Sequence, residues 1–346
     1  MRPRLPSIDQ VLPYLSKMDD NRTYSNFGPL VREYTERIAA RVRVPDPTRI
    51  VLTANATIAL EGACSLFDVS TYQVPTFTFP ATAHAVIRAQ KHLKIVDIQE
   101  TDWEIDPDWR DGPSTGIITV APFGAAPRPR SQTDRHVEII DAAASLGAQP
   151  MDLANLPEST VVIFSLHATK AFGIGEGGFA VFGSTATAKQ FKTWLNFGFA
   201  GSRESQIVAT NGKMSEIAAA YGLAVTDKWE QERDEWRAAN TQAKAITERA
   251  GLWTPLSKLN GVSPYWIVQF PDSTAAREAE ARLTLGGVET RRWWERGLHK
   301  MPAFRGMAGD SYPVTDDVAS RTIGLPMYRD LDDVAFQRIE EALAGS

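Results

Sequence analysis

A lysine near the middle of the chain stands where an amine could do chemistry. The apolar run TVVIFS ends at Ser165, and the following LHATK brings His167 and Lys170 into a predicted loop. Most lysines are solvated surface cations, and that interpretation of Lys170 stays open at this point. A lysine at a strand end beside a Gly-rich turn, however, can lose solvation and act as an amine nucleophile. Lys170 is therefore a candidate for covalent catalysis.

The Gly-rich segment GIGEGG, residues 173–178, formally matches GxGxxG. A dinucleotide site needs a strand before these glycines and a helix after them. Here the glycines lead directly into the β-rich run GFAVF, residues 178–182, so the context argues against that site. We expect the glycines to let the backbone turn tightly beside a bulky ligand.

A carboxylate occupies a similar place after an earlier strand. Asp141 ends the apolar run VEIID and is followed by the small residues AAASLG, which would let a flat molecule approach. A cap of a helix or turn is the alternative role for this side chain. Enzymes that use pyridoxal 5′-phosphate (PLP) need a carboxylate beside the pyridine nitrogen, because it keeps the ring protonated as an electron sink. Asp141 fits this requirement, and Lys170 supplies the amine.

Short apolar runs alternate with helical periodicity through the first half of the chain. This rhythm predicts an α/β layer with a largely parallel sheet, in which ligands bind at the carboxyl ends of the strands. Lys170 and Asp141 both follow such ends. The expected strands cover residues 49–53, 71–75, 93–98, 116–121, 137–141, 160–165 and 178–182, and the expected helices 29–42, 56–67 and 81–90.

The second half predicts a smaller α+β unit. A long helical stretch begins near Lys213, with Ser215 as its expected N-terminal cap, and runs to about residue 250 as a bridge between domains. We expect a large domain over residues 1–230 and a small one over 231–346. The further elements expected are strands at 265–270 and 287–294 and helices at 274–285 and 332–343.

Over nearly its whole length the chain resembles the DegT/StrS-type family of sugar aminotransferases, which are fold type I PLP enzymes. SLHATKAFGIGEGG is similar to the segment with the family's Schiff-base lysine, and IIDAAASLGA to the segment with its pyridine-binding aspartate. VPTFTFPATAHAV, NATIAL, TNGKMSEIAAAYGL and TIGLPMY resemble further family segments in the same order. The resemblance implies a large PLP-binding domain with a mostly parallel central sheet flanked by helices, and a small C-terminal α+β domain.

The resemblance also implies roles for particular residues. Lys170 and Asp141 would be the catalytic pair. Where many relatives carry Gln or His three residues after the aspartate, to contact the cofactor's phenolic oxygen, this chain has Ala144. That hydrogen bond must therefore come from elsewhere or be absent. The implied cofactor contacts are Thr57, the backbone of Ile58 and Ser165 at the phosphate, Phe79 stacked on the ring, and Asn211 at the phosphate of a neighbouring subunit.

Basic and aromatic residues gather in RRWWERGLHK, residues 291–300. Guanidinium groups bind phosphates in bidentate fashion, so Arg291 and Arg292 could hold a diphosphate beside an aromatic ring. A solvated surface is the alternative. His299 could line the substrate site, although a lone histidine is more often structural.

Composition sets outer limits on function. The formal net charge of −5 over 346 residues argues against nucleic acid as a partner. The single cysteine, Cys64, allows no disulfide framework, and the five histidines show no metal-ligand spacing, so we expect no metal site. No apolar run is long enough for a signal peptide or a membrane span, which favours a soluble cytoplasmic protein.

The resemblance implies transfer of an amino group, with glutamate the expected donor, to a keto deoxysugar linked to a nucleotide. It also implies a homodimer that shares its active sites. Two alternatives stay open: a catalytically silent regulator that binds PLP or a sugar, and an aminotransferase for a keto substrate without a nucleotide. A PLP-dependent sugar dehydratase is disfavoured, because such relatives replace the lysine with histidine.

Overall fold

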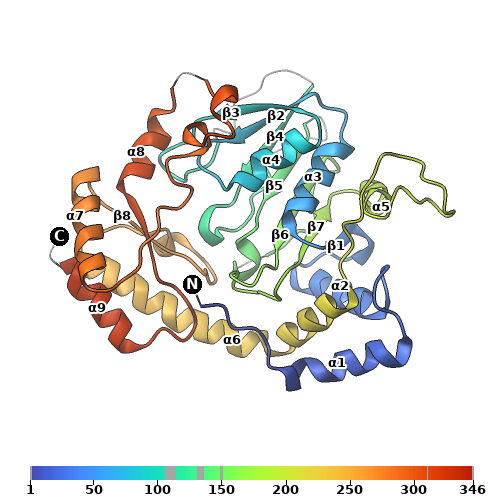
Figure 1. Ribbon diagram of the computed structural model, residues 1–346, viewed down its shortest axis with the longest axis horizontal. Helices are drawn as coiled ribbons and strands as arrows, with labels where there is room; N and C mark the ends of the chain where they lie inside the picture. Colours follow the sequence, from blue (N-terminus) through green and yellow to red (C-terminus); the bar gives the residue numbers. More distant parts are fainter. Residues whose placement is uncertain (1, 106–113, 131–135, 149–150, 310, 345–346) are drawn as a thin grey trace.

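The computed structural model describes residues 2–105, 114–130, 136–148, 151–309 and 311–344. Within these residues seven strands form one sheet in the order β1-β7-β6-β5-β4-β2-β3 (Figure 1). The pairs among β2 to β6 are parallel, and β7 runs antiparallel to both of its neighbours, which confirms a largely parallel sheet. The strands are β1 (Ile50–Thr53), β2 (Thr71–Pro75), β3 (His92–Val96), β4 (Thr115–Val120), β5 (Glu138–Asp141), β6 (Thr160–Ser165) and β7 (Gly178–Phe182).

The central strands β5 and β6 are buried along their whole length, because helices cover both faces of the sheet. In β6 alternate side chains enter different cores: Val161 and Ile163 pack with one group of helices, and Val162 and Phe164 with the other. The first group is α3 (Ala56–Leu66), α4 (Pro80–Arg88) and α5 (Thr185–Trp194). The second group comprises α1 (Ile8–Asn21), α2 (Pro29–Arg41) and α6 (Glu216–Arg249).

Helix α6 connects the two halves of the molecule. Its cap is the expected one, since the Ser215 hydroxyl oxygen accepts a hydrogen bond of 3.1 Å from the backbone N–H of Ala218. The first half of the helix packs on α1 and α2, and α6 also contacts β8 and α9 of the C-terminal unit described below (Figure 1). The predicted domain boundary at 230 and 231 falls inside this continuous helix, so the chain passes between the two units without a linker there.

In the described C-terminal part, β8 (Trp266–Gln269) pairs antiparallel with β9 (Thr322–Leu325). Helices α7 (Ser273–Leu285), α8 (Pro313–Arg321) and α9 (Asp333–Ala344) complete the expected α+β unit. The strand predicted at 287–294 is wrong. Only Arg291 makes a ladder contact, a single bridge to Gly324, and the backbone then turns through left-handed φ angles of 59° and 54° at Trp294 and Glu295. None of the described helices is both long and apolar enough to cross a membrane.

Candidate functional site

A cavity of about 440 Å³ opens where strands β4, β5 and β6 end and helices α3 and α4 begin. Parallel strands bring their carboxyl ends to one edge of the sheet, which is why residues far apart in sequence meet here. Six of the residues to which the sequence analysis gave a catalytic, cofactor or substrate role line this cavity: Thr57, Phe79, Asp141, Ser165, Lys170 and Arg291.

Lys170 lies in a loop that the glycines make possible. The Ala168 N–H donates to the Gly175 carbonyl at 2.8 Å, so the chain folds back on itself directly after β6. A Cβ on Gly173 would come within 2.6 Å of the Ala168 carbonyl oxygen, and Gly175 has a φ of 104°. Both positions therefore favour glycine. The loop directs the Lys170 amine to the Tyr265 hydroxyl, to which its Nζ donates at 2.7 Å.

Asp141 ends β5, the strand next to the one that leads to Lys170. Its carboxylate is buried and accepts hydrogen bonds from the Thr82 hydroxyl at 2.7 Å and the Ala143 N–H at 3.1 Å. Burial raises the pKa of Asp141 above its ordinary value, and these hydrogen bonds and the Lys170 charge only partly oppose that rise. A cationic group in the cavity would complement this carboxylate and lower its pKa.

The start of α3 offers a place for an anion. Asn55 caps the helix by accepting a hydrogen bond of 2.9 Å from the Ile58 N–H. The N–H groups of Ala56 and Thr57 belong to the first turn and have no acceptor within the helix, so they can bind a phosphate. The Ile58 N–H is engaged by the Asn55 side chain, so the expected phosphate contact of the Ile58 backbone stays a prediction. Ser165 lines the same cavity and accepts from the His167 N–H at 3.2 Å.

Two predicted substrate residues point elsewhere. Arg292 forms an ion pair of 2.8 Å with Glu280 and donates to the Ser320 carbonyl at 2.8 Å, so its guanidinium braces the C-terminal unit. His299 is buried between the Thr76 hydroxyl at 2.7 Å and the Asp316 carboxylate at 3.0 Å. Neither side chain lines the cavity, and we correct both assignments.

Asn211 is exposed and outside the cavity of its own chain. Its Oδ1 accepts a hydrogen bond of 2.6 Å from the Lys213 amine. The expected contact of Asn211 is with a neighbouring subunit, so its role stays a prediction.

Comparison with known proteins agrees with this geometry. Residues 8–344 match the model of the DegT/DnrJ/EryC1/StrS aminotransferase family. The chain belongs to that family. A curated relative from Escherichia coli, a dTDP-4-amino-4,6-dideoxy-D-glucose transaminase, is 24% identical, with 99% of this chain and 97% of the relative covered.

Solved structures support the assignment to the DegT/DnrJ/EryC1/StrS family. The crystal structure of DesI, solved in the presence of its TDP-sugar product, has a TM-score of 0.85 and 27% identity, with 99% of this chain and 91% of DesI covered. A Streptococcus pneumoniae structure described as a sugar aminotransferase in its PMP form has a TM-score of 0.86 at 18% identity, covers 100% and 98% of the two chains, and so supports the fold alone. The protein is an enzyme, a PLP-dependent aminotransferase of a family that acts on sugars.

The cavity of this family member suits PLP chemically. Asp141 is a buried carboxylate whose described contacts include no ion pair, and a protonated pyridine nitrogen is the cation that it lacks. The first turn of α3 offers N–H donors for a phosphate, with the Ser165 hydroxyl in the same cavity. The Lys170 amine supplies the nucleophile that an aldehyde requires. These residues fit the cofactor.

Sequence reasoning missed Tyr265, the side chain that contacts the Lys170 amine. Its ring lies edge-on to Trp293 at 4.9 Å and to Phe123 at 5.7 Å, and Phe123 stacks on Trp294 at 4.6 Å. Tyr265 stands just before β8, in an apolar run typical of any buried strand. No local pattern marks it as a site residue, because it reaches the cavity only through the packing of the two units.

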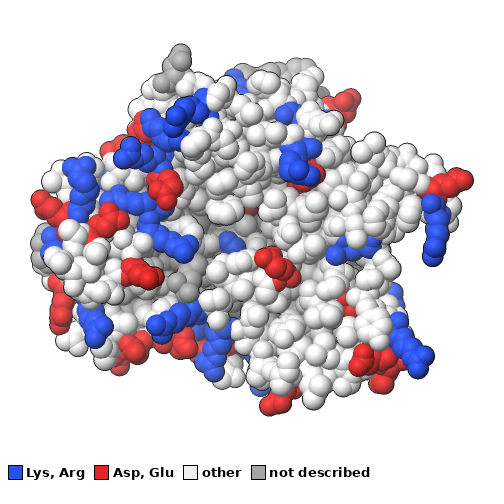
Figure 2. All heavy atoms as spheres, viewed as in Figure 1, with Lys and Arg blue, Asp and Glu red and all other residues white. Residues whose placement is uncertain are grey.

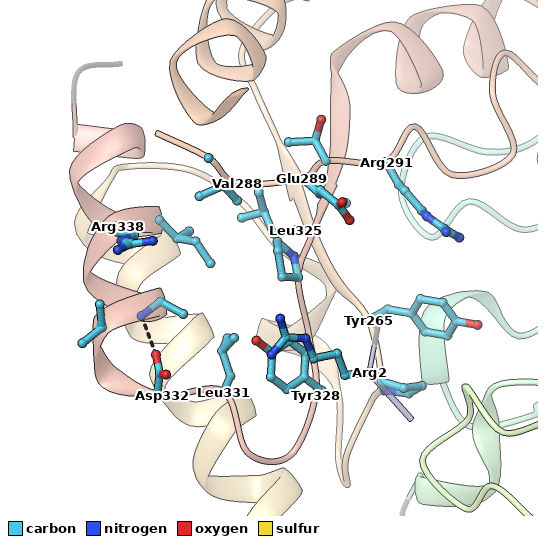
Figure 3. Close-up of a pocket in the computed structure, with 18 of the residues that line it drawn as sticks. Arg2, Tyr265, Val288, Glu289, Arg291, Leu325, Tyr328, Leu331, Asp332 and Arg338 are labelled. Carbon is cyan, nitrogen blue, oxygen red and sulfur yellow. Dashed lines mark hydrogen bonds between the residues drawn. The ribbon is translucent and has the colours of Figure 1, made fainter. Parts of the chain in front are cut away.

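A second cavity, of about 580 Å³, adjoins the first and shares Tyr265, Arg291 and Trp293 with it. In Figure 3, Arg338 projects from α9, Arg2 lies against the Tyr328 ring, and Arg291 lies on the side away from α9. Within the described part of the chain, none of these three arginines forms an ion pair. Figure 2 shows Lys and Arg side chains interspersed with Asp and Glu over the C-terminal elements, at the left of the view. An anionic ligand in the second cavity would therefore meet arginines that have no carboxylate partner among the described residues.

Proposed function

We propose that this enzyme transfers an amino group from an amino acid, with glutamate the expected donor, to a nucleotide-linked keto deoxysugar. Lys170 and Asp141 are the catalytic residues. One observation carries this proposal: the Lys170 amine and the buried Asp141 carboxylate, delivered by neighbouring strands, line one cavity. This is the arrangement that PLP chemistry requires.

Different residues of the chain would have different roles in this reaction. Bound PLP supplies an aldehyde that condenses with amines and a ring that accepts electrons. Asp141 holds a negative charge against the ring nitrogen and so keeps it protonated. Lys170 holds the resting cofactor and, once its amine is free, moves a proton to or from the substrate carbon that carries nitrogen. The Thr82 hydroxyl, itself fully buried, fixes the Asp141 carboxylate in place.

The acceptor class rests on the relatives and on charge. The relative from Escherichia coli is named for a dTDP sugar, and DesI was solved with a TDP-sugar product. We propose that Arg291 binds the diphosphate of such a substrate, because it lines both cavities and its guanidinium has no carboxylate partner among the described residues. Arg2 and Arg338 would attract the same anion.

The direct test of the proposed function separates the two half-reactions. Incubating the PLP-loaded enzyme with glutamate alone should convert the bound cofactor to pyridoxamine phosphate, which is followed by the change in visible absorbance. After the 2-oxoglutarate formed from glutamate has been removed, nucleotide-linked keto sugars should regenerate PLP, and free keto sugars or 2-keto acids other than 2-oxoglutarate should do so poorly. A clear preference for the free compounds would reassign the acceptor class and favour the alternative without a nucleotide.

Replacing Arg291 with alanine should raise the Michaelis constant for a nucleotide-linked sugar on the order of tenfold or more, because a charge-assisted contact is lost. The half-reaction with glutamate should change little, since the donor has no diphosphate. The Michaelis constant of the wild type should also increase with salt.

Arg292→Ala is the matched control for this prediction. It removes the neighbouring guanidinium, which is paired with Glu280, so it should lower the melting temperature and leave the Michaelis constant near the wild-type value. Equal Michaelis constants for the Arg291 variant and the wild type would remove Arg291 from the substrate site.

We also propose a homodimer with shared active sites. Phe79, the predicted ring-stacking residue, is 57% exposed although it lines the cavity, and Val208, on the segment that leads to Asn211, is 98% exposed. Such apolar exposure is expected of a surface that a second copy covers. Asn211 would then complete the phosphate site of that copy.

Complementation tests this arrangement. Lys170→Ala and Asn211→Ala chains, each weakly active or inactive alone, should regain activity when mixed and refolded, because a hybrid dimer contains one site with both native residues. About a quarter of wild-type activity is expected from random pairing of equal amounts. Light scattering should give a dimer mass, and a fully active monomer would rule the arrangement out.

A further inference from the structure

Tyr265 brings a hydroxyl into the cavity, in which the side chain at position 144 offers no hydrogen-bond donor. Ala144 lies three residues after Asp141, lines the cavity and has no polar side chain. The Tyr265 hydroxyl lies 2.7 Å from the Lys170 amine in the same cavity. We propose that Tyr265 donates a hydrogen bond to the phenolic oxygen of PLP, in place of the side chain that Ala144 lacks. The inference rests on the proposed role of Lys170 as the residue that holds the cofactor.

Cofactor chemistry connects the two contacts. In PLP the phenolic oxygen and the aldehyde are on adjacent ring carbons, so the nitrogen that replaces the aldehyde oxygen lies beside the phenolic oxygen. A hydroxyl within hydrogen-bonding distance of the Lys170 nitrogen is therefore well placed for the phenolic oxygen too. Tyr265 can accept from the free amine and donate to the phenolic oxygen when the cofactor is held, since its hydroxyl does either.

Packing holds the Tyr265 ring in place. The tyrosine is 8% exposed, and its ring is fixed by edge contacts to Trp293 and Phe123. Its backbone N–H donates to the Ser263 hydroxyl at 3.0 Å, and that hydroxyl donates to the Phe123 carbonyl at 2.6 Å. A side chain with so few alternative positions loses little entropy when it forms a directional hydrogen bond.

Ala144 and Tyr265 belong to one cluster. Ala144 packs against the aromatic group that contains Tyr265, Phe123 and Trp103. A longer polar side chain at position 144 would enter the space beside these rings. The small side chain of Ala144 thus leaves room for the Tyr265 ring, and the hydrogen-bond donor to the phenolic oxygen comes from the C-terminal unit.

The hydrogen bond should lower the pKa of the nitrogen that links Lys170 to the cofactor. When this nitrogen is deprotonated, the phenolic oxygen carries negative charge and the Tyr265 hydroxyl stabilises it. When the nitrogen is protonated, its own N–H competes for that oxygen. A donor to the charged oxygen therefore favours the deprotonated form of the nitrogen. Removing the donor should raise this pKa.

The experiment is a pH titration of the visible absorbance of the PLP-loaded protein, which needs no turnover. Tyr265→Phe keeps the ring and removes only the hydroxyl, and it should raise the pKa by about one to two units, as expected for a hydrogen bond to a charged group. Tyr24→Phe removes an exposed hydroxyl from a tyrosine that does not line either cavity and should leave the pKa unchanged.

A second variant distinguishes hydrogen bonding from packing. Ala144→Gln, introduced into the Tyr265→Phe protein, supplies a new donor and should return the pKa toward the wild-type value. If Tyr265→Phe titrates like the wild type, or if Ala144→Gln leaves the raised pKa where it was, the inference is overturned. Absence of a lysine-linked absorbance band in the wild type would instead overturn the proposed role of Lys170.

Discussion

Lys170→Ala should abolish the visible absorbance of the lysine-linked cofactor and lower turnover by at least about a thousandfold, because only a primary amine can form that linkage and move the proton afterwards. The fold should survive, since the Lys170 side chain is only partly buried and its one described hydrogen bond is to Tyr265. Absorbance spectra, circular dichroism and single-turnover assays with glutamate measure these three effects.

Lys192→Ala is the control for the loss of a lysine. Lys192 is a cation of α5 whose amine lies 4.4 Å from the centre of the Phe27 ring, and it does not line either cavity. Its replacement should leave both the spectrum and the turnover near wild type. A Lys170→Ala enzyme that keeps the lysine-linked band and full activity would disprove the central assignment.

Much of the site was predictable because its residues follow strand ends. The order of apolar runs fixes which loops meet at the carboxyl edge of a parallel sheet, so Lys170, Asp141 and Ser165 could be placed together without coordinates. The tight turn expected at the glycines after Lys170 is confirmed, whereas the bulky ligand beside it stays a prediction. Their role depends on the local backbone, at Gly173 and Gly175, and local backbone demands are visible in sequence.

Side-chain direction in the C-terminal unit could not be predicted in this way. Arg291 and Arg292 are adjacent and chemically identical, yet one lines both cavities and the other pairs with Glu280. Which of the two side chains faces the cavities depends on the bridge between Arg291 and Gly324, a contact between residues 33 positions apart. A second long-range pairing, between Trp266–Gln269 and Thr322–Leu325, makes β9, and not residues 287–294, the partner of β8.

Asp141→Asn should bind PLP but slow transamination on the order of a hundred- to a thousandfold, because a neutral amide no longer favours the protonated ring. The hydrogen bond from the Ala143 N–H can persist to the amide oxygen, so the local geometry should be kept. Single-turnover conversion with glutamate measures the loss. A wild-type rate would remove Asp141 from the catalytic pair.

Although Asp141→Asn should slow the reaction, it should make the cofactor-free protein more stable. Burial raises the pKa of Asp141 in the folded state, so folding disfavours its charged form at neutral pH. Cofactor-free Asp141→Asn should therefore melt roughly 2 °C or more above the cofactor-free wild type at pH 7.5. Because the folded wild type binds protons more readily than the unfolded chain, its stability gains as the pH falls toward the raised pKa, and the difference between the two proteins should shrink. With PLP bound, the wild type should instead have the higher melting temperature, because the cofactor's cation compensates the charge that only the wild type carries.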